Sequence, residues 1–142
     1  MRAKLPLVAL ALGLVLSASK CADKSGAMSM TDVLDKKWML QSVAGQALQL
    51  PEGAQNPWIQ LAADKSLSGF GGCNNLMGQF NLDGSTIGFP GVGSTKKYCE
   101  STQKIEDGFM GALREANSFS LDKGLLKLMK DGTELASFTG GK

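Results

Sequence analysis

A single stretch of helical periodicity, over residues 102–116, constrains the fold more than any other feature of this sequence. Apolar side chains recur there every three or four residues, which places them on one face of an α-helix. Ser101 or Thr102 offers a capping oxygen at its start. The apolar face comprises Ile105, Phe109, Ala112, Leu113 and Ala116. We therefore expect one helix, with Phe109 and Leu113 packed against the rest of the domain.

Short strand patterns flank this helix on both sides. They cover residues 38–43, 58–63, 67–72, 79–82 and 86–89 before the helix, and residues 119–121, 125–129 and 134–138 after it. Glycine-containing turns join the last three strands into an antiparallel meander. Glycines at 69, 71 and 72 indicate a sharp bend or the close approach of another backbone. The fold class is therefore α+β: a strongly curved antiparallel sheet, open and barrel-like, with the one helix packed against it.

The N-terminal residues have the composition of an export signal. Arg2 and Lys4 precede an apolar run from Leu5 to Leu16, and small residues follow. This run is shorter than the roughly 20 apolar residues that cross a bilayer, and it suits a secretory signal peptide. We expect a signal peptide over 1–20, a flexible tether over 21–32 and one globular domain over 33–142.

Two modes of processing fit this leader. The small residues 17–19 suit an ordinary signal peptidase, which would release a periplasmic protein. The sequence before Cys21 is similar to a bacterial lipobox, in which the cysteine is acylated and anchors the protein in a membrane. Lys20 departs from the small residue usual at that position. The chain has three cysteines, and an odd cysteine in an exported protein favours acylation. Cys21 is therefore the lipidation candidate, and the expected location is the periplasm or, for a lipoprotein, the outer membrane.

Two cysteine-containing motifs precede the helix. They are Gly72-Cys73-Asn74 and the segment from Thr95 to Cys99. Their order, and their position before the helix, resemble the META domain family, whose members include the bacterial heat-shock protein HslJ. The resemblance covers residues 33–139. It implies a compact barrel-like domain of an envelope or secreted protein, with Gly72, Asn74 and Thr95 as structural motif residues. No catalytic activity is established for the family, so it implies no catalytic residue, metal or cofactor.

Cys73 and Cys99, one in each motif, are expected to form a disulfide. Export brings them to an oxidising compartment, and closing the loop between them would stabilise the domain by roughly 3–4 kcal/mol. A metal site and a redox pair are the alternatives. Both suit the sequence less well, because the chain has no histidine and no C-x-x-C. Asn74 is expected to hydrogen-bond backbone groups in a tight bend.

The absence of histidine also removes the usual base of nucleophilic catalysis. Glu106, Asp107 and Glu115 fall in the predicted helix and are assigned to its solvent face. The glycine-rich segments lack the order of a phosphate loop, and a formal net charge of +2 without a basic stripe argues against nucleic acid. We expect a protein that is not an enzyme and that uses no cofactor or metal.

Two functions fit these observations. The first is a non-catalytic cell-envelope protein that acts through protein interactions, with a stress-related role suggested only by the name of a family member. The alternative is a binder of a lipid or another small apolar ligand in the cavity of the open barrel. The candidate lining residues, each of which also suits plain core, are Trp38, Trp58, Phe70, Leu76, Phe80, Ile87 and Phe89. A surface patch of aromatic and methionine side chains would favour the first function. A membrane contact is expected only through Cys21, and the sequence identifies neither partner nor ligand.

Overall fold

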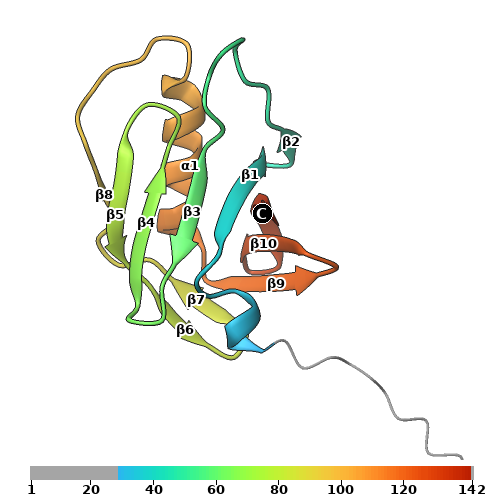
Figure 1. The fold of residues 1–142 in the computed structure, drawn as a ribbon. Coiled ribbons are helices and arrows are strands. Elements are labelled where there is room, and N and C mark those ends of the chain that lie inside the picture. Colours follow the sequence, from blue (N-terminus) through green and yellow to red (C-terminus); the bar gives the residue numbers. More distant parts are fainter. Residues whose placement is uncertain (1–28, 142) are drawn as a thin grey trace, which may run out of the picture.

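The computed structural model describes residues 29–141 as a curled sheet with one helix (Figure 1). Its elements are the 3₁₀ helix η1 (Met30–Asp32), the helix α1 (Gln103–Glu115), and the strands β1 (Lys37–Val43), β2 (Gln46–Ala47), β3 (Trp58–Leu61), β4 (Ser66–Phe70), β5 (Asn75–Gln79), β6 (Asn81–Asp83), β7 (Thr86–Gly88), β8 (Gly93–Ser94), β9 (Ser118–Asp122), β10 (Leu125–Lys130) and β11 (Thr133–Gly140). The predicted signal peptide and Cys21 lie outside the described residues. Within the described part, no helix is long and apolar enough to span a bilayer.

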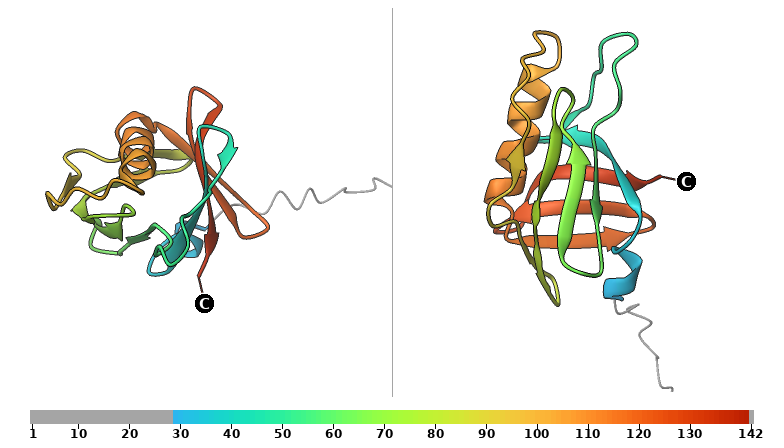
Figure 2. Two further views of the ribbon diagram at one scale, coloured as in Figure 1. Left: turned by 90° about the horizontal axis from the view of Figure 1, so that it is seen from above. Right: turned by 60° about the vertical axis from the view of Figure 1, so that its left-hand side comes forward.

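The strands form one antiparallel sheet. Their order is β6-β7-β9-β10-β11-β1-β3-β4-β5-β8, with β2 paired to β1. The sheet curls into a half-barrel, and α1 packs against it (Figures 1 and 2). β5 leads into β6 through Phe80 alone, so the chain links strands near opposite ends of the sheet. The expected fold class, a strongly curved antiparallel sheet with one packed helix, is confirmed.

The last two hairpins close on turns whose middle residues both have positive φ. The angle is 49° at Lys123 and 79° at Gly124, and it is 50° at Asp131 and 82° at Gly132. Two successive positive values are the signature of the type I′ turn, whose twist matches that of an antiparallel strand pair. The predicted meander is found as β9-β10-β11.

The glycines after β3 lie where neighbouring segments come close. A Cβ atom at Gly69, on β4, would lie 2.6 Å from the carbonyl oxygen of Trp58 on β3. One at Gly71 would lie 2.7 Å from Cγ of Glu106 on α1. The close backbone approach expected from the sequence is therefore found at Gly69, whereas the neighbour at Gly71 is a helix side chain.

The core fills the space between the sheet and α1. Phe109 and Leu113 are both fully buried, as the helical stripe predicts, and the Phe109 ring lies 5.6 Å from that of Phe138 on β11. Thr102 is the N-cap residue, but its side chain makes no capping hydrogen bond, so the expected capping oxygen is not used. η1 occupies the end of the predicted tether, and Val33 directly after it is fully buried.

Candidate functional site

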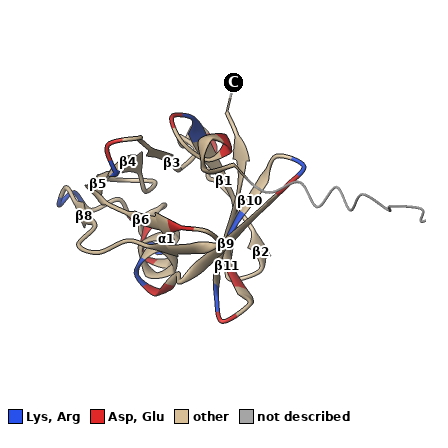
Figure 3. Cartoon of the chain, turned by 90° about the horizontal axis from the view of Figure 1, so that it is seen from below, with Lys and Arg blue, Asp and Glu red and all other residues tan. Residues whose placement is uncertain are grey.

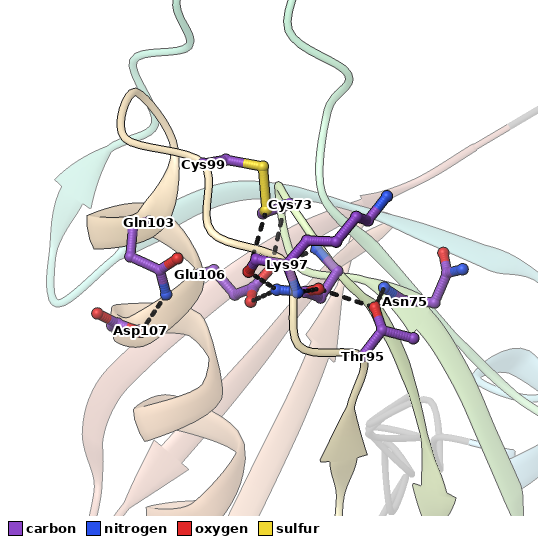
Figure 4. The surroundings of a disulfide bond; sticks show 9 residues. Cys73, Asn75, Thr95, Lys97, Cys99, Gln103, Glu106 and Asp107 are labelled. Atoms are coloured by element: carbon purple, nitrogen blue, oxygen red, sulfur yellow. Dashed lines mark hydrogen bonds between the residues drawn. A yellow bond between two sulfur atoms is a disulfide. The ribbon is translucent and has the colours of Figure 1, made fainter.

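The two cysteine motifs meet beside the N-terminal end of α1. Cys73 follows β4, Cys99 precedes the helix, and the two form a disulfide with 5.7 Å between their Cα atoms (Figure 4). This is the pair expected from the sequence. Gly72, just before the first cysteine, has a φ of 121°, a conformation that side-chain-bearing residues rarely adopt. The glycine of the first motif is therefore required by the backbone itself.

Asn74 joins the first motif to the second. Its Nδ2 donates to the carbonyl oxygen of Lys97 at 2.9 Å, and its Oδ1 accepts the backbone N–H of Lys97 at 2.8 Å. The same oxygen accepts the Thr95 hydroxyl at 2.8 Å. The sequence correctly predicted that Asn74 bonds backbone groups. Those groups belong to the segment of the second motif, more than 20 residues away, and not to a local bend.

Glu106 completes this cluster from the helix side. Its Oε2 accepts the backbone N–H groups of Cys73 at 3.0 Å and of Asn74 at 2.6 Å, and its Oε1 accepts Asn74 Nδ2 at 2.6 Å. The residue is only 3% exposed. The assignment of Glu106 to the solvent face of the helix is therefore wrong, whereas Asp107 and Glu115 are exposed as expected.

The sequence does contain a signal for this placement. Glu106 precedes Phe109 by three residues and Leu113 by seven, the spacing of one helix face. A carboxyl group on an apolar face is buried only when donors face it, because an unpaired buried charge is costly. Here the donors come from the first motif, and they include the backbone N–H groups of Cys73 and Asn74. Such donors cannot be identified from side-chain types.

The second motif forms one wall of a polar cleft against α1. The cleft has a volume of about 560 Å³. Its helix wall consists of Gln103, Asp107, Met110 and Arg114, and its floor includes Asn74 and Glu106. The Lys97 side chain extends away from Gln103 and Asp107 (Figure 4). The polar atoms at the floor are already hydrogen-bonded to one another, so they stabilise the wall of the cleft and leave little capacity for a ligand.

A second cleft, which we call the apolar groove, lies on another face of α1. Its volume is about 810 Å³. It is lined by Val43, Ala44, Gln46, Ala47, Leu48, Gln49, Ser101, Lys104, Ile105 and Gly108. Val43, Leu48 and Ile105 are half-buried and pack against the core. The groove therefore opens at the surface directly above the hydrophobic core, between α1 and the β1-β2 hairpin.

On the face of the sheet away from the core, half-buried side chains stand in register across five strands. Going from β10 through β11, β1 and β3 to β4, they are Leu125, Thr139, Met39, Trp58 and Phe70. We call these residues the outer row. None of them belongs to the core or packs against it. At about 4.8 Å between neighbouring strands, the row is roughly 19 Å long. The Lys37 ammonium lies 4.1 Å from the centre of the Trp58 ring.

Charged residues lie mainly on turns and on α1, and both signs occur together (Figure 3). Four turns of the described residues carry an aspartate next to a lysine: Asp64-Lys65, Asp35-Lys36, Asp122-Lys123 and Lys130-Asp131. At the first of these, the hydroxyl of Ser66 donates to the Asp64 carboxylate, as does the Ser66 backbone N–H. These bonds hold the pKa of Asp64 below its ordinary value. The Asp64 carboxylate hydrogen-bonds within its own turn and lines neither the polar cleft nor the apolar groove.

Comparison with known families and structures identifies the fold. The family model of the META domain matches residues 31–141. The chain belongs to the META domain family. A solved NMR structure of a protein from Burkholderia xenovorans is similar to this META domain with a TM-score of 0.65 and 24% identity, covering 79% of this chain and 86% of the other. A crystal structure of a DUF4847 family protein from Bacteroides vulgatus has a TM-score of 0.56 and 18% identity, covering 79% and 96%. At these identities the likeness shows the fold alone. No curated protein matches the sequence.

The interior of this META domain is filled by side chains. Of the seven residues named as candidate cavity lining, five belong to the core and are at most 7% exposed: Trp38, Leu76, Phe80, Ile87 and Phe89. The other two, Trp58 and Phe70, belong to the outer row. None of the seven lines the polar cleft or the apolar groove. Within residues 29–141, no group of three His, Cys, Asp or Glu side chains is placed to hold a metal ion.

Proposed function

We propose that this META-family protein is a non-catalytic bacterial cell-envelope protein that acts by binding another envelope protein through its outer row. The observation that carries this proposal is the row itself. Three of its members, Met39, Trp58 and Phe70, are large apolar side chains that lie next to one another on neighbouring strands and are only half-buried. Contiguous apolar surface of this kind marks interaction sites. Met77, on β5, lies on the same face beside the row and is 57% exposed.

The composition of the row suits a protein interface. Tryptophan, phenylalanine and methionine are enriched in such interfaces, and they contribute most when they lie at the centre of the contact. Trp58 and Phe70 are directly paired neighbours in the row, and Met39 is paired with Trp58 on its other side. Met77 lies on the same face of β5, opposite Ser68. Lys37, over the Trp58 ring, supplies a charge at the edge. A partner with an apolar centre and an acidic rim would be complementary to this surface.

The motif residues support a non-catalytic role. Asn74 and Glu106 use their hydrogen-bonding atoms on each other and on the backbone of the two motifs. A general acid or base must reach the substrate proton that it transfers, and these groups are committed to holding Cys73 and Lys97 in place. The hydrogen bonds of this cluster therefore connect the end of β4 to α1 and stabilise their relative position.

The outer row can be tested by photo-crosslinking in living cells. A photoreactive phenylalanine analogue placed at Phe70 should give a discrete high-mass adduct with an envelope protein. The matched control is the same analogue at Thr86, an exposed position on β7 outside the row. Replacing Met39 by Glu should abolish the Phe70 adduct while leaving the melting temperature within a few degrees of the parent, because Met39 does not pack in the core. Equal adducts from Phe70 and Thr86, or none from either, would refute the outer row as the binding surface.

Export and anchoring form part of the same proposal. The disulfide supports residence in an oxidising compartment. Acylation of Cys21, which lies outside the described residues, would attach the domain to a membrane, and two or more acyl chains make such an attachment stable. The intact mass of the protein purified from bacterial membranes should show a diacylglycerol adduct. Cys21→Ser should move the protein to the soluble periplasmic fraction without changing its melting temperature. An unmodified protein that starts at Lys20 would show instead that an ordinary peptidase cuts after Ser19.

A further inference from the structure

The apolar groove has the shape and the lining of a binding site for a slender apolar ligand. Its volume of about 810 Å³ falls within the range of roughly 300–1,000 Å³ that is usual for small-molecule sites. One wall comes from the β1-β2 hairpin and carries Val43, Ala47 and Leu48. The other is α1, where Ile105 and the bare backbone of Gly108 face the hairpin. A Cβ atom at Gly108 would lie 3.2 Å from Val43 Cγ1, so the helix and the hairpin are already in close contact at the base of the groove.

The polar groups of the groove are unevenly distributed along α1. Ser101 and Lys104 both lie at the N-terminal end of the helix, whereas Gly108 follows one turn later. No aspartate or glutamate lines the groove. The Lys104 ammonium is exposed and makes no ion pair or hydrogen bond among those found within residues 29–141. The N-terminal end of a helix also carries a partial positive charge. One end of the groove is therefore complementary to a negative charge. The hairpin wall adds the polar side chains of Gln46 and Gln49 beside the apolar Val43, Ala47 and Leu48.

We propose that the groove binds a long-chain fatty acid, with its carboxylate at Lys104 and its hydrocarbon chain along Val43, Leu48 and Ile105. A hydrocarbon chain brings no hydrogen-bonding groups, so burying it against these side chains leaves no polar group of the ligand without a partner. A peptide would bring a row of amide groups, for which the groove offers only Gln46, Gln49 and Ser101 as uncharged partners. The proposal shares no residue with the outer row and does not rest on the proposed protein interaction.

The site can be tested with palmitate and the purified protein in a calorimetric titration. The parent should bind one palmitate per chain in a saturable manner. Ala47→Trp places a large side chain in the groove, and Ala47 is exposed on the short strand β2, so the core is undisturbed. Binding should weaken by roughly tenfold or more in this variant, since the bound chain and the indole cannot occupy the same volume. The melting temperature, measured alongside, should equal that of the parent.

The charge at the end of the groove is tested separately. Lys104→Gln should weaken palmitate binding by up to about fivefold, the factor expected for one exposed ion pair, and should leave the binding of hexadecanol unchanged. Lys96→Gln is the matched control, because Lys96 is exposed but lines the polar cleft; it should bind palmitate like the parent. The proposal is overturned if the parent shows no saturable binding. It is equally overturned if folded Ala47→Trp binds like the parent, or if Lys96→Gln loses as much affinity as Lys104→Gln.

Discussion

The substitution Glu106→Gln keeps the size and shape of the side chain and replaces one carboxyl oxygen by an NH₂ group. Three N–H donors face this carboxyl group in the structure: two from the backbone, at Cys73 and Asn74, and one from the Asn74 side chain. A glutamine amide has only one oxygen. Whichever way it is turned, at least one of these donors then faces another donor and loses its acceptor.

The cost follows from burial. Glu106 is 3% exposed, so water cannot replace the missing acceptor. A buried donor left without a partner costs about 1–3 kcal/mol, and the remaining bonds lose the strengthening that an ionised acceptor provides. We expect Glu106→Gln to lower the free energy of unfolding by about 2–4 kcal/mol. Asp107→Asn is the matched control. Asp107 is exposed and accepts one hydrogen bond, from Gln103 at 2.9 Å, so the loss there should stay below about 0.5 kcal/mol.

Urea denaturation followed by circular dichroism measures both variants. The titrations are done at neutral pH without reducing agent, so that the Cys73–Cys99 disulfide is intact in each protein. Equal slopes against urea concentration show that the two variants expose the same surface on unfolding. If Glu106→Gln is as stable as Asp107→Asn, the hydrogen-bonded cluster does not stabilise the domain.

Three further predictions concern the core, the disulfide and one turn. Phe109→Ala should lower the free energy of unfolding by about 3–5 kcal/mol, because the ring is fully buried; a melting temperature equal to the parent's would contradict its packing. Thiol labelling of the unfolded, unreduced protein should leave Cys73 and Cys99 unmodified, and reduction should cost about 3.5 kcal/mol of stability; labelling at both positions before reduction would rule out the pairing. Ser66→Ala should raise the pKa of Asp64 toward its usual value in an NMR titration. The folded pKa of Asp64 lies below its unfolded pKa, so the ionised carboxylate stabilises the fold at any pH above the unfolded pKa. That stabilisation is lost as the pH falls through the folded pKa. An unchanged pKa of Asp64 in Ser66→Ala would show that Ser66 is not the cause.

Local patterns in the sequence determined the helix and the turns of this protein. The helix is predicted over residues 102–116 and found at Gln103–Glu115, because an amphipathic stripe records which residues share a face. The turns at Lys123-Gly124 and Asp131-Gly132 were predicted from the glycines between the strands, and each of these glycines has a positive φ. These features depend on neighbours within a few positions, so no knowledge of the rest of the chain was needed.

Strand β5 was not predicted, and its composition explains why. Asn75–Gln79 contributes one buried side chain, Leu76, while Met77 points outward. Its regular structure depends on pairing with β4 along its whole length and with β8 at two positions. The short strands β2 and β8 depend in the same way on partners that the sequence does not specify.

Only the tertiary structure decided which apolar residues are core and where Glu106 lies. Trp38 and Trp58 look alike in the sequence, yet the first is buried in the core and the second lies in the outer row, since successive strands place their alternating side chains according to register. Glu106 is stabilised inside by donors that lie 32 and 33 residues earlier in the chain. Periodicity along the chain shows which side chains point the same way. Whether that side is buried, and whether a polar group on it finds a partner, depends on which distant segments fold against it.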